Sequence, residues 1–133
     1  VDVLPNTKVT GVTILTSLSD ADVAEIGFRS AALESAVDLA KVAVNAGAAA
    51  IVCSPLEISA VRQQIGTAPI IITPGVRPLG MVGTDDQQRT MTPKDAIAAG
   101  ANLVVIGRPI TQSWTQGAQA MKERAQEIGA DLI

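Results

Sequence analysis

Histidine and tyrosine are absent from this 133-residue sequence, and cysteine, tryptophan and phenylalanine occur once each. Without histidine, a Ser-His-Asp or Cys-His mechanism is excluded, so any catalysis has to use carboxylates, Lys, Arg, hydroxyl groups or the backbone. The single cysteine, Cys53, excludes an internal disulfide and a cysteine-based zinc site. We expect Cys53 to be a small core residue rather than a nucleophile, because no base is evident beside it.

The shortage of aromatic residues and of clustered positive charge argues against a nucleic-acid partner. Aromatic residues make up 2 % of the chain, the formal net charge is -3, and no Lys/Arg cluster occurs. No apolar run reaches the roughly 18 residues that span a bilayer, and no signal-peptide pattern opens the sequence. The first residue is Val1 rather than Met, which is typical of a fragment or a processed product. We therefore expect a cytoplasmic protein with neither a nucleic-acid nor a membrane partner.

Short apolar runs alternate with helical patterns, and this alternation predicts an α/β fold with a parallel sheet and right-handed crossovers. Hydrophobic residues make up 47 % of the chain, enough to bury one core at this length. The predicted strands span residues 9–15, 49–53, 70–73 and 103–106. The predicted helices span residues 19–26, 30–46, 55–65, 92–99 and 116–128, the last ended by Gly129.

Two of these helices have clear sequence signatures. Four apolar residues at helical spacing predict the buried face of the helix that begins near Ser30: Leu33, Val37, Ala40 and Val44. Another helix begins with Ser54, Pro55 and Glu57, which is the pattern of a capping box with proline in the first turn.

A faint internal repeat relates residues 46–53 to residues 99–106, each of which reads as a helix end, a tight turn and a strand. Repeated β/α units are typical of a (β/α) barrel. A complete eightfold barrel needs at least about 200 residues, whereas this chain holds four units. We therefore predict that residues 1–133 form a single half-barrel.

The residues directly after the strands are candidates for a ligand site, because parallel sheets bind ligands at the carboxyl ends of their strands. After the third strand comes Arg77, and after the fourth come Gly107 and Arg108, followed by a short helix predicted from Pro109. The end of each of these two strands offers a guanidinium group and a backbone glycine. Guanidinium groups and accessible backbone amides suit the binding of a phosphate group. The alternative is that Gly107 forms a turn and that both arginines are solvated surface charges.

Hydroxyl groups and a long polar loop complete the set of candidates. Thr16, Ser17 and Ser54 end their strands and could donate hydrogen bonds to a ligand. Residues 79–89 form a long polar segment that includes Gln87, and long loops in compact domains are often functional. A polar loop without a function is the alternative.

Five short motifs, in this order, resemble orotidine 5'-phosphate decarboxylase of the bacterial type. They are residues 11–17 (GVTILTS), 51–54 (IVCS), 73–78 (TPGVRP), 86–93 (DQQRTMTP) and 105–111 (VIGRPIT). The resemblance covers nearly the whole chain from about Val9. It implies a (β/α)8 TIM barrel, in which this chain supplies strands five to eight and a preceding N-terminal half is missing.

The resemblance also implies roles for single residues. Arg77, Arg108 and the Gly107 amide resemble the ligands of the nucleotide 5'-phosphate. Gln87 resembles the loop glutamine that bridges phosphate and pyrimidine, although Gln88 is an alternative because the loop is about one residue longer than the usual pattern. Thr16 resembles a pyrimidine-pocket residue, with Ser17 and Ser54 as weaker candidates.

The chemistry of the resembled family depends on a D-x-K-x-x-D motif and a further lysine, with no metal or organic cofactor. That motif is absent from this sequence. The resemblance therefore implies a carboxy-lyase that converts orotidine 5'-monophosphate to uridine 5'-monophosphate and CO2 in pyrimidine biosynthesis. The chain would supply the phosphate- and pyrimidine-binding half and would be inactive alone.

Two further interpretations remain open. The chain could be a non-catalytic nucleotide-binding half-barrel, or a related barrel enzyme acting on a sugar phosphate; Arg77, Gln87 and Arg108 together favour a nucleotide over a sugar phosphate. In a half-barrel the two outer strands, residues 9–15 and 103–106, have no neighbouring strand on their outer sides. We therefore expect a homodimer or docking to the missing N-terminal half.

Overall fold

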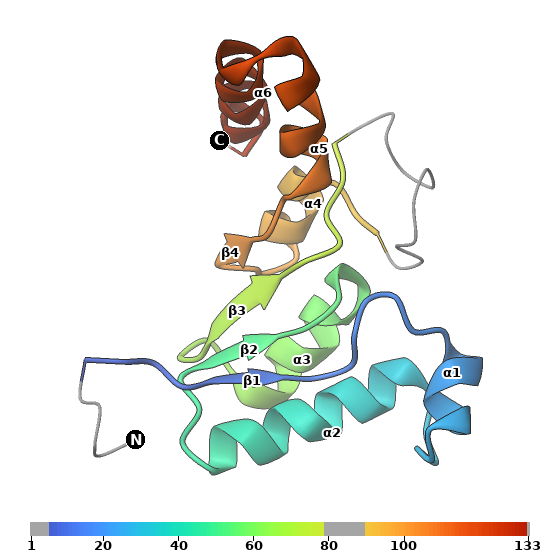
Figure 1. The fold of residues 1–133 in the computed structure, drawn as a ribbon. Helices are drawn as coiled ribbons and strands as arrows, with labels where there is room; N and C mark the ends of the chain where they lie inside the picture. The colour runs from blue at the N-terminus through green and yellow to red at the C-terminus, as the bar shows by residue number, and fades with distance from the viewer. Residues whose placement is uncertain (1–5, 79–89, 133) are drawn as a thin grey trace.

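The computed structural model describes residues 6–78 and 90–132, which form a four-stranded sheet and the helices that connect its strands (Figure 1). All neighbouring strands are parallel, and their order in the sheet is their order in the chain. The strands are β1 (Thr10–Val12), β2 (Ala50–Val52), β3 (Ile70–Thr73) and β4 (Leu103–Val104). The predicted α/β class and the four predicted strands are confirmed.

The two outer strands are shorter than the predicted ranges 9–15 and 103–106. Ladder bonding continues for one residue past each strand, since Thr13 N donates to Val52 O at 3.1 Å and Val105 N donates to Thr73 O at 2.9 Å. Beyond its bond, the segment after β1 loses its partner, because β2 ends at Val52 and η1 begins at Pro55. Each outer strand also has only one neighbour to hold it in the sheet.

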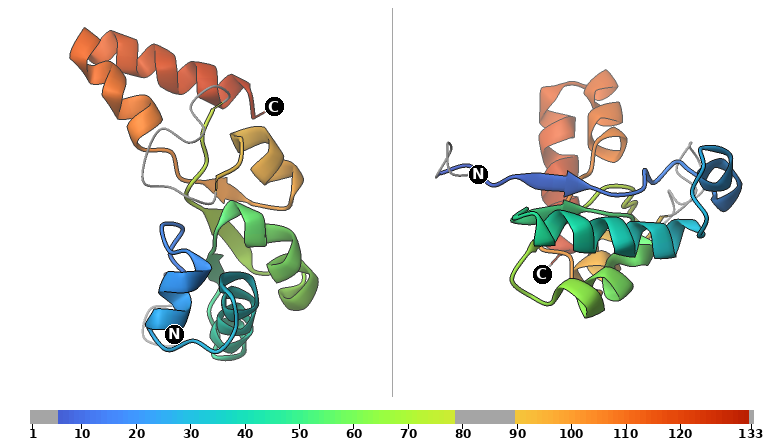
Figure 2. Two further views of the ribbon diagram at one scale, coloured as in Figure 1. Left: turned by 90° about the vertical axis from the view of Figure 1, so that its right-hand side faces the viewer. Right: turned by 90° about the horizontal axis from the view of Figure 1, so that it is seen from below.

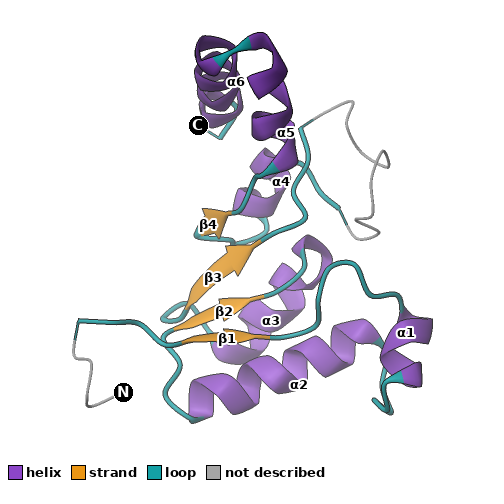
Figure 3. Cartoon of the chain, viewed as in Figure 1, coloured by secondary structure: helices purple, strands orange, loops and turns teal. Residues whose placement is uncertain are grey.

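Helical segments separate successive strands, and a final group follows β4 (Figure 3). They are α1 (Asp20–Glu25), α2 (Ala32–Asn45), η1 (Pro55–Glu57), α3 (Ile58–Ile65), α4 (Pro93–Ala98), α5 (Arg108–Thr111), η2 (Gln112–Gln116) and α6 (Ala118–Ala130). Each strand is thus followed by helix, which confirms the count of four β/α units. The observed N-caps Ser19, Ser54 and Thr92 begin their helical segments where the sequence predicted.

One face of the sheet carries the main core, and α2 and α3 lie against that face (Figure 2). Ile51 and Ile71 are paired across β2 and β3 and are fully buried in this core. A smaller core between β1, α1 and α2 consists of Ile14, Val23, Ala32 and Ala36. Because side chains alternate across a strand, residues one position away from Ile51 and Ile71 point to the opposite face.

The buried face of α2 differs from the predicted stripe. Leu33 is 39 % exposed, and the fully buried positions are occupied by small residues: Ala32, Ser35, Ala36 and Ala40. Small residues are needed because α2 approaches β1 very closely: a Cβ placed on Gly11 would be 2.6 Å from Ala43 Cβ. The prediction for Leu33 was therefore wrong, whereas Val37 and Val44 do pack against the core.

The last helix also differs at both ends from the predicted range 116–128. It begins at Ala118, because Gly117 at the N-cap has a φ of 101° that a helix cannot contain. It continues through Gly129 to Ala130, since Gly129 does not adopt the positive φ with which glycine ends a helix. Figures 1 and 2 show α6 lying beyond α5, apart from the covered face of the sheet.

Candidate functional site

The carboxyl ends of the four parallel strands share one edge of the sheet, and the predicted site residues all follow these ends. The described candidates fall into two groups. Thr16 and Ser17 follow β1, and Ser54 follows β2. Arg77 follows β3, and Gly107 and Arg108 follow β4.

A cavity of about 300 Å³ lies at the ends of β1 and β2. Thr16, which is 8 % exposed, and the half-buried Ser17 both line it, and their predicted contact with a ligand stays a prediction. Its walls are otherwise apolar and come from Val12, Ile14, Leu15, Val52, Cys53 and Pro74. An apolar hollow with two hydroxyl groups is able to hold a flat heterocycle and fix its orientation.

Sequence reasoning gave no role to Pro74, which forms part of this wall from the end of β3. The signal was present, since proline directly after a buried strand marks a rigid turn at the site edge. Cys53 is 1 % exposed and belongs to the main core, which agrees with its expected packing role.

Ser54 follows the end of β2, as its place in the sequence predicts, and its contact with a ligand stays a prediction. It is fully buried and does not line the cavity. Its backbone N donates to Glu57 Oε2 at 2.9 Å, while its hydroxyl oxygen has no hydrogen-bond partner among the described residues. Ser54 is the N-cap residue of η1, and its backbone bond to Glu57 holds the turn into that segment.

Arg77 is buried, with 5 % of its surface exposed, so the alternative of a solvated surface arginine is wrong. Its Nη1 donates to Val76 O at 2.8 Å, and its backbone N donates to Met91 O at 2.9 Å. The second bond lies beside an isolated bridge between Val76 and Met91, which ties the segment after β3 to the segment before α4. These contacts fix the backbone that carries the guanidinium.

Arg108 is exposed and is the first residue of α5, with Gly107 at the N-cap. The short helix predicted from Pro109 is present and begins one residue earlier. Ile110 N and Thr111 N donate to Gly107 O at 2.9 and 3.0 Å. A Cβ added to Gly107 would meet no atom within 4 Å, so the Gly107 backbone borders open space that a ligand can enter.

The two arginines occupy equivalent positions on neighbouring strands. Thr73 on β3 is paired with Val104 on β4, and each arginine comes four residues after its paired position. The structure thus gives the two cations corresponding places at the same edge of the sheet. Neither arginine lines the 300 Å³ cavity, so the hydroxyl group and the arginine group are separate sets on one edge.

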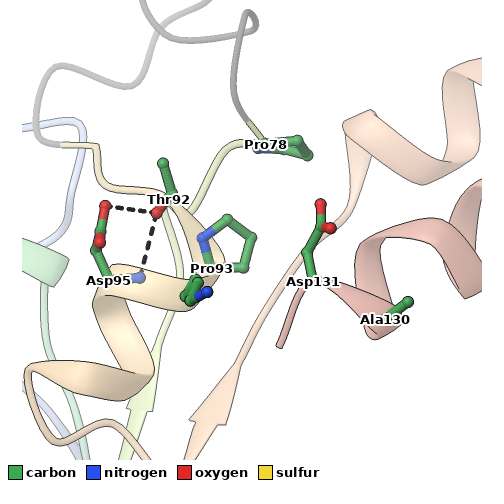
Figure 4. A pocket seen from close by; sticks show the side chains of 7 residues that line it. Pro78, Thr92, Pro93, Asp95, Ala130 and Asp131 are labelled. Carbon is green, nitrogen blue, oxygen red and sulfur yellow. Dashed lines mark hydrogen bonds between the residues drawn. The ribbon is translucent and has the colours of Figure 1, made fainter. Parts of the chain in front are cut away.

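Gln87 lies outside the described residues, as does Gln88, so the predicted loop ligand stays a prediction. A second cavity, of about 420 Å³, lies beside Pro78 and between the start of α4 and the end of α6 (Figure 4). In it Thr92 Oγ1 donates to Asp95 Oδ2 at 2.6 Å, and Asp95 N donates to Thr92 Oγ1 at 3.2 Å. These bonds satisfy the start of α4, and none of the predicted site residues that the structure describes lines this hollow.

No group of three or more His, Cys, Asp or Glu side chains in residues 6–78 and 90–132 is arranged to hold a metal ion. Among the helices described, none combines the length and apolar character needed to cross a membrane.

Comparison with known proteins places the chain in a family. The sequence model of the orotidine 5'-phosphate decarboxylase / HUMPS family matches residues 2–123. An orotidine 5'-phosphate decarboxylase from Thermobifida fusca is 46 % identical over 132 residues, covering 98 % of this chain and 56 % of that protein. One from an Anaeromyxobacter species is 45 % identical over 106 residues, covering 80 % of this chain and 46 % of that protein.

Structural comparison gives the same family. The crystal structure of orotidine 5'-phosphate decarboxylase from Lactobacillus acidophilus matches with a TM-score of 0.73 and 35 % identity, over 94 % of this chain and 49 % of that one. The chain spans about half the length of the curated relatives it matches and corresponds to their C-terminal portion. The predicted TIM-barrel class and its partial extent are therefore confirmed. This chain belongs to the orotidine 5'-phosphate decarboxylase / HUMPS family.

Proposed function

We propose that this chain is the phosphate- and pyrimidine-binding half of an orotidine 5'-phosphate decarboxylase. The observation that carries the proposal is the pair of arginines at equivalent positions after β3 and β4, in a chain whose relatives bear that name. In this proposal the whole enzyme converts orotidine 5'-monophosphate to uridine 5'-monophosphate and CO2 in pyrimidine biosynthesis.

Arg77, Arg108 and the Gly107 amide are proposed to bind the 5'-phosphate. A phosphate has three oxygens, and two planar guanidinium groups together with a backbone N–H match that geometry. Arg77 is buried and held at its backbone, so little entropy is lost when it binds, whereas Arg108 is exposed and reaches the ligand from α5. Gln87 would close over the bound nucleotide.

Thr16 and Ser17 are proposed to contact the pyrimidine ring, because their hydroxyl groups line a small hollow with mostly apolar walls. The ring would be oriented by hydrogen bonds at one rim and by packing against Pro74 and Val52. Binding energy from the phosphate can then be used to hold the reacting end of the substrate in place.

The proton-transfer and charge-stabilising groups would come from the portion of the relatives that this chain does not cover. The sequence has no D-x-K-x-x-D motif, so this chain offers no carboxylate-lysine array to act on the substrate carboxylate. We propose that the 133-residue chain alone does not decarboxylate, and that it works with a missing N-terminal half or with a second copy. The proposed setting is the cytoplasm, and the net charge of -3 supports a nucleotide rather than a nucleic-acid ligand.

Calorimetric titration with uridine 5'-monophosphate tests the binding role. Replacing Arg108 by Ala should weaken binding about thirtyfold, or about 2 kcal/mol, through loss of a charged hydrogen-bond pair. Arg29→Ala is the matched control, because Arg29 is also an exposed arginine but lies between α1 and α2. Equal affinities in the two variants would remove Arg108 from the phosphate site.

The missing motif supports a second candidate function, a non-catalytic half-barrel that binds nucleotides and associates with itself. Turnover by the isolated chain tests what the two candidates have in common. Consumption of orotidine 5'-phosphate by the pure 133-residue chain would contradict this second candidate and also the proposal that the acid/base groups lie elsewhere. Uridine 5'-monophosphate binding without turnover is the result expected of both proposals for the isolated chain.

A further inference from the structure

A short chain of hydrogen bonds connects Met91 to the guanidinium group of Arg77. The backbone oxygen of Met91 accepts a bond from Arg77 N at 2.9 Å. That N–H belongs to the same peptide unit as Val76 O, which accepts a bond from Arg77 Nη1 at 2.8 Å. Because a peptide unit is planar, a rotation of this unit moves both bonds together. The peptide unit between Val76 and Arg77 therefore links the position of the guanidinium group to the position of Met91.

Met91 is itself anchored on two sides. Its side chain is half-buried and packs against the main core, in which its bridge partner Val76 is fully buried. The next residue, Thr92, is the N-cap of α4 and forms two hydrogen bonds with Asp95 (Figure 4). Thr92 O also accepts a bond from Ala96 N at 3.0 Å, and Ala96 is fully buried. The core and the start of α4 thus set the place of the Met91 carbonyl oxygen.

The residues next to Arg77 restrict its backbone but do not determine its direction. Gly75 has a φ of 80°, a conformation that glycine adopts without strain. Pro78 biases the residue before it, Arg77, toward extended backbone. Neither restriction sets the tilt of the peptide unit between Val76 and Arg77. That tilt is fixed by a contact distant in the sequence, the bond from Arg77 N to Met91 O.

We propose that Met91 is a positioning residue for Arg77, and that it fixes the direction in which the guanidinium group faces a phosphate group. This inference rests on the proposed function, in which Arg77 binds the 5'-phosphate. Arg77 is 5 % exposed, so its side chain has little room to reorient when a ligand arrives. A guanidinium group binds two phosphate oxygens only when its planar fork faces them. The direction set by Met91 therefore decides whether Arg77 can form both bonds.

Met91→Ala keeps the carbonyl oxygen but removes the side chain that anchors it in the core. Its affinity for uridine 5'-monophosphate should fall about tenfold, whereas uridine, which has no phosphate, should bind as it does to the wild type. Met91→Leu has a similar volume and should retain the wild-type affinity. Ile65→Ala is the matched control: Ile65 is also half-buried against the main core, but it belongs to α3 and not to the segment bonded to Arg77. This control should bind both ligands as the wild type does.

Calorimetry of a double variant separates positioning from a general effect on the fold. Arg77→Met keeps most of the buried stem and removes the guanidinium group. If Met91 acts through that group, Met91→Ala should cause no further loss of uridine 5'-monophosphate affinity in the Arg77→Met background. A further loss of the same size as in the wild-type background would overturn the proposal. An unchanged affinity of Met91→Ala alone, or an equal loss for uridine, would also overturn it.

Hydrogen exchange of the wild-type chain tests the bond itself and does not depend on a variant that folds. The Arg77 amide should exchange slowly because it donates to Met91 O, and exchange at the rate of an unbonded amide would overturn the proposal. Failure of the proposed function gives a different result. If Arg77→Met binds uridine 5'-monophosphate as tightly as the wild type, the phosphate role of Arg77 fails and this inference fails with it. If Arg77→Met binds weakly while Met91→Ala does not, only this inference fails.

Discussion

Asn102 Oδ1 accepts a hydrogen bond from Arg62 Nη2 at 2.6 Å, although 40 positions separate the two residues in the chain. The same oxygen accepts a bond from Ile71 N at 2.8 Å, and Asn102 N donates to Ile71 O at 2.9 Å. Arg62 also donates to the carbonyl oxygens of Gly66, Pro69 and Gly100. One guanidinium on α3 thus joins the turns that lead into β3 and β4, at the end of the sheet opposite the candidate site.

Replacing Arg62 by Ala should lower the free energy of unfolding by about 2–3 kcal/mol, because several carbonyl oxygens lose a charged donor together. Urea denaturation measures the change. Lys41→Ala is the control: Lys41 Nζ lies 3.1 Å from Asp38 Oδ1, both side chains are well exposed, and such a pair contributes less than about 1 kcal/mol. Equal stabilities of the two variants would show that the network around Arg62 contributes little.

Gly11→Ala should destabilise the chain by about 1–3 kcal/mol, because the added methyl group would meet Ala43 Cβ at 2.6 Å and Ile51 Cδ1 at 3.3 Å. The matched control is Gly129→Ala on α6, where an added Cβ meets nothing within 4 Å. That change should instead stabilise the chain by about 0.5–1 kcal/mol, through helix propensity. Thermal unfolding of both variants measures the sign of each stability change. If Gly11→Ala also stabilised the chain, α2 could not lie as close to β1 as the structure shows.

Asp20 begins α1 but also caps α2, since its Oδ1 accepts a bond from Ala32 N at 2.8 Å. The N-cap residue of α2 is Ala31, whose side chain has no oxygen to do this. Asp20→Ala should therefore cost about 1 kcal/mol of stability, whereas Asp20→Asn, which keeps an acceptor oxygen, should cost less. Chemical denaturation of the two variants measures the difference, and equal costs would argue against capping by this oxygen.

The pKa of Asp22 is lowered from its ordinary value of 3.8 by hydrogen bonds from the Ser19 hydroxyl and the Ser19 amide. A carboxyl group whose pKa is depressed by folding stabilises the folded state when it is ionised. This stabilisation is fully present above 3.8 and is lost as the pH falls through the lowered pKa of the folded chain. The stability difference between the wild type and Asp22→Asn should therefore be constant from about pH 5 to about pH 7 and shrink in more acidic solution. Urea unfolding across this range measures it, and a difference independent of pH would contradict the assignment.

The sequence predicted those parts of the fold that depend on local rules. Three helical segments begin at residue types that suit an N-cap, namely Ser19, Ser54 and Thr92. Such an N-cap pattern is contained in four consecutive residues, so the sequence alone reveals it. The buried face of α2 could not be read in this way. It depends on how closely the helix approaches β1, and that distance is set by Gly11 and Ala43, which lie 32 positions apart.

For the candidate site, too, the sequence predicted what depends on local patterns but not what depends on contacts between strands. Each arginine could be placed after its strand, but their equivalent positions follow from the pairing of Thr73 with Val104, which no local pattern specifies. The burial of Ser54 and the contribution of Pro74 to the cavity wall likewise follow from how β2 and β3 end side by side. The capping function of Asp20 was also missed, because its partner Ala32 belongs to the next helix.

Arg77→Lys tests whether the buried guanidinium binds phosphate or only supports the fold. Lysine keeps the positive charge but loses the planar fork that binds two oxygens, so affinity for uridine 5'-monophosphate should fall about tenfold to a hundredfold. Uridine lacks the phosphate and should bind the variant and the wild type equally. Calorimetry with both ligands, at a temperature where circular dichroism shows the variant to be folded, measures the two affinities. An equal loss for uridine and its monophosphate would mean that Arg77 acts through the backbone it contacts at Val76 O, and that the phosphate is bound elsewhere.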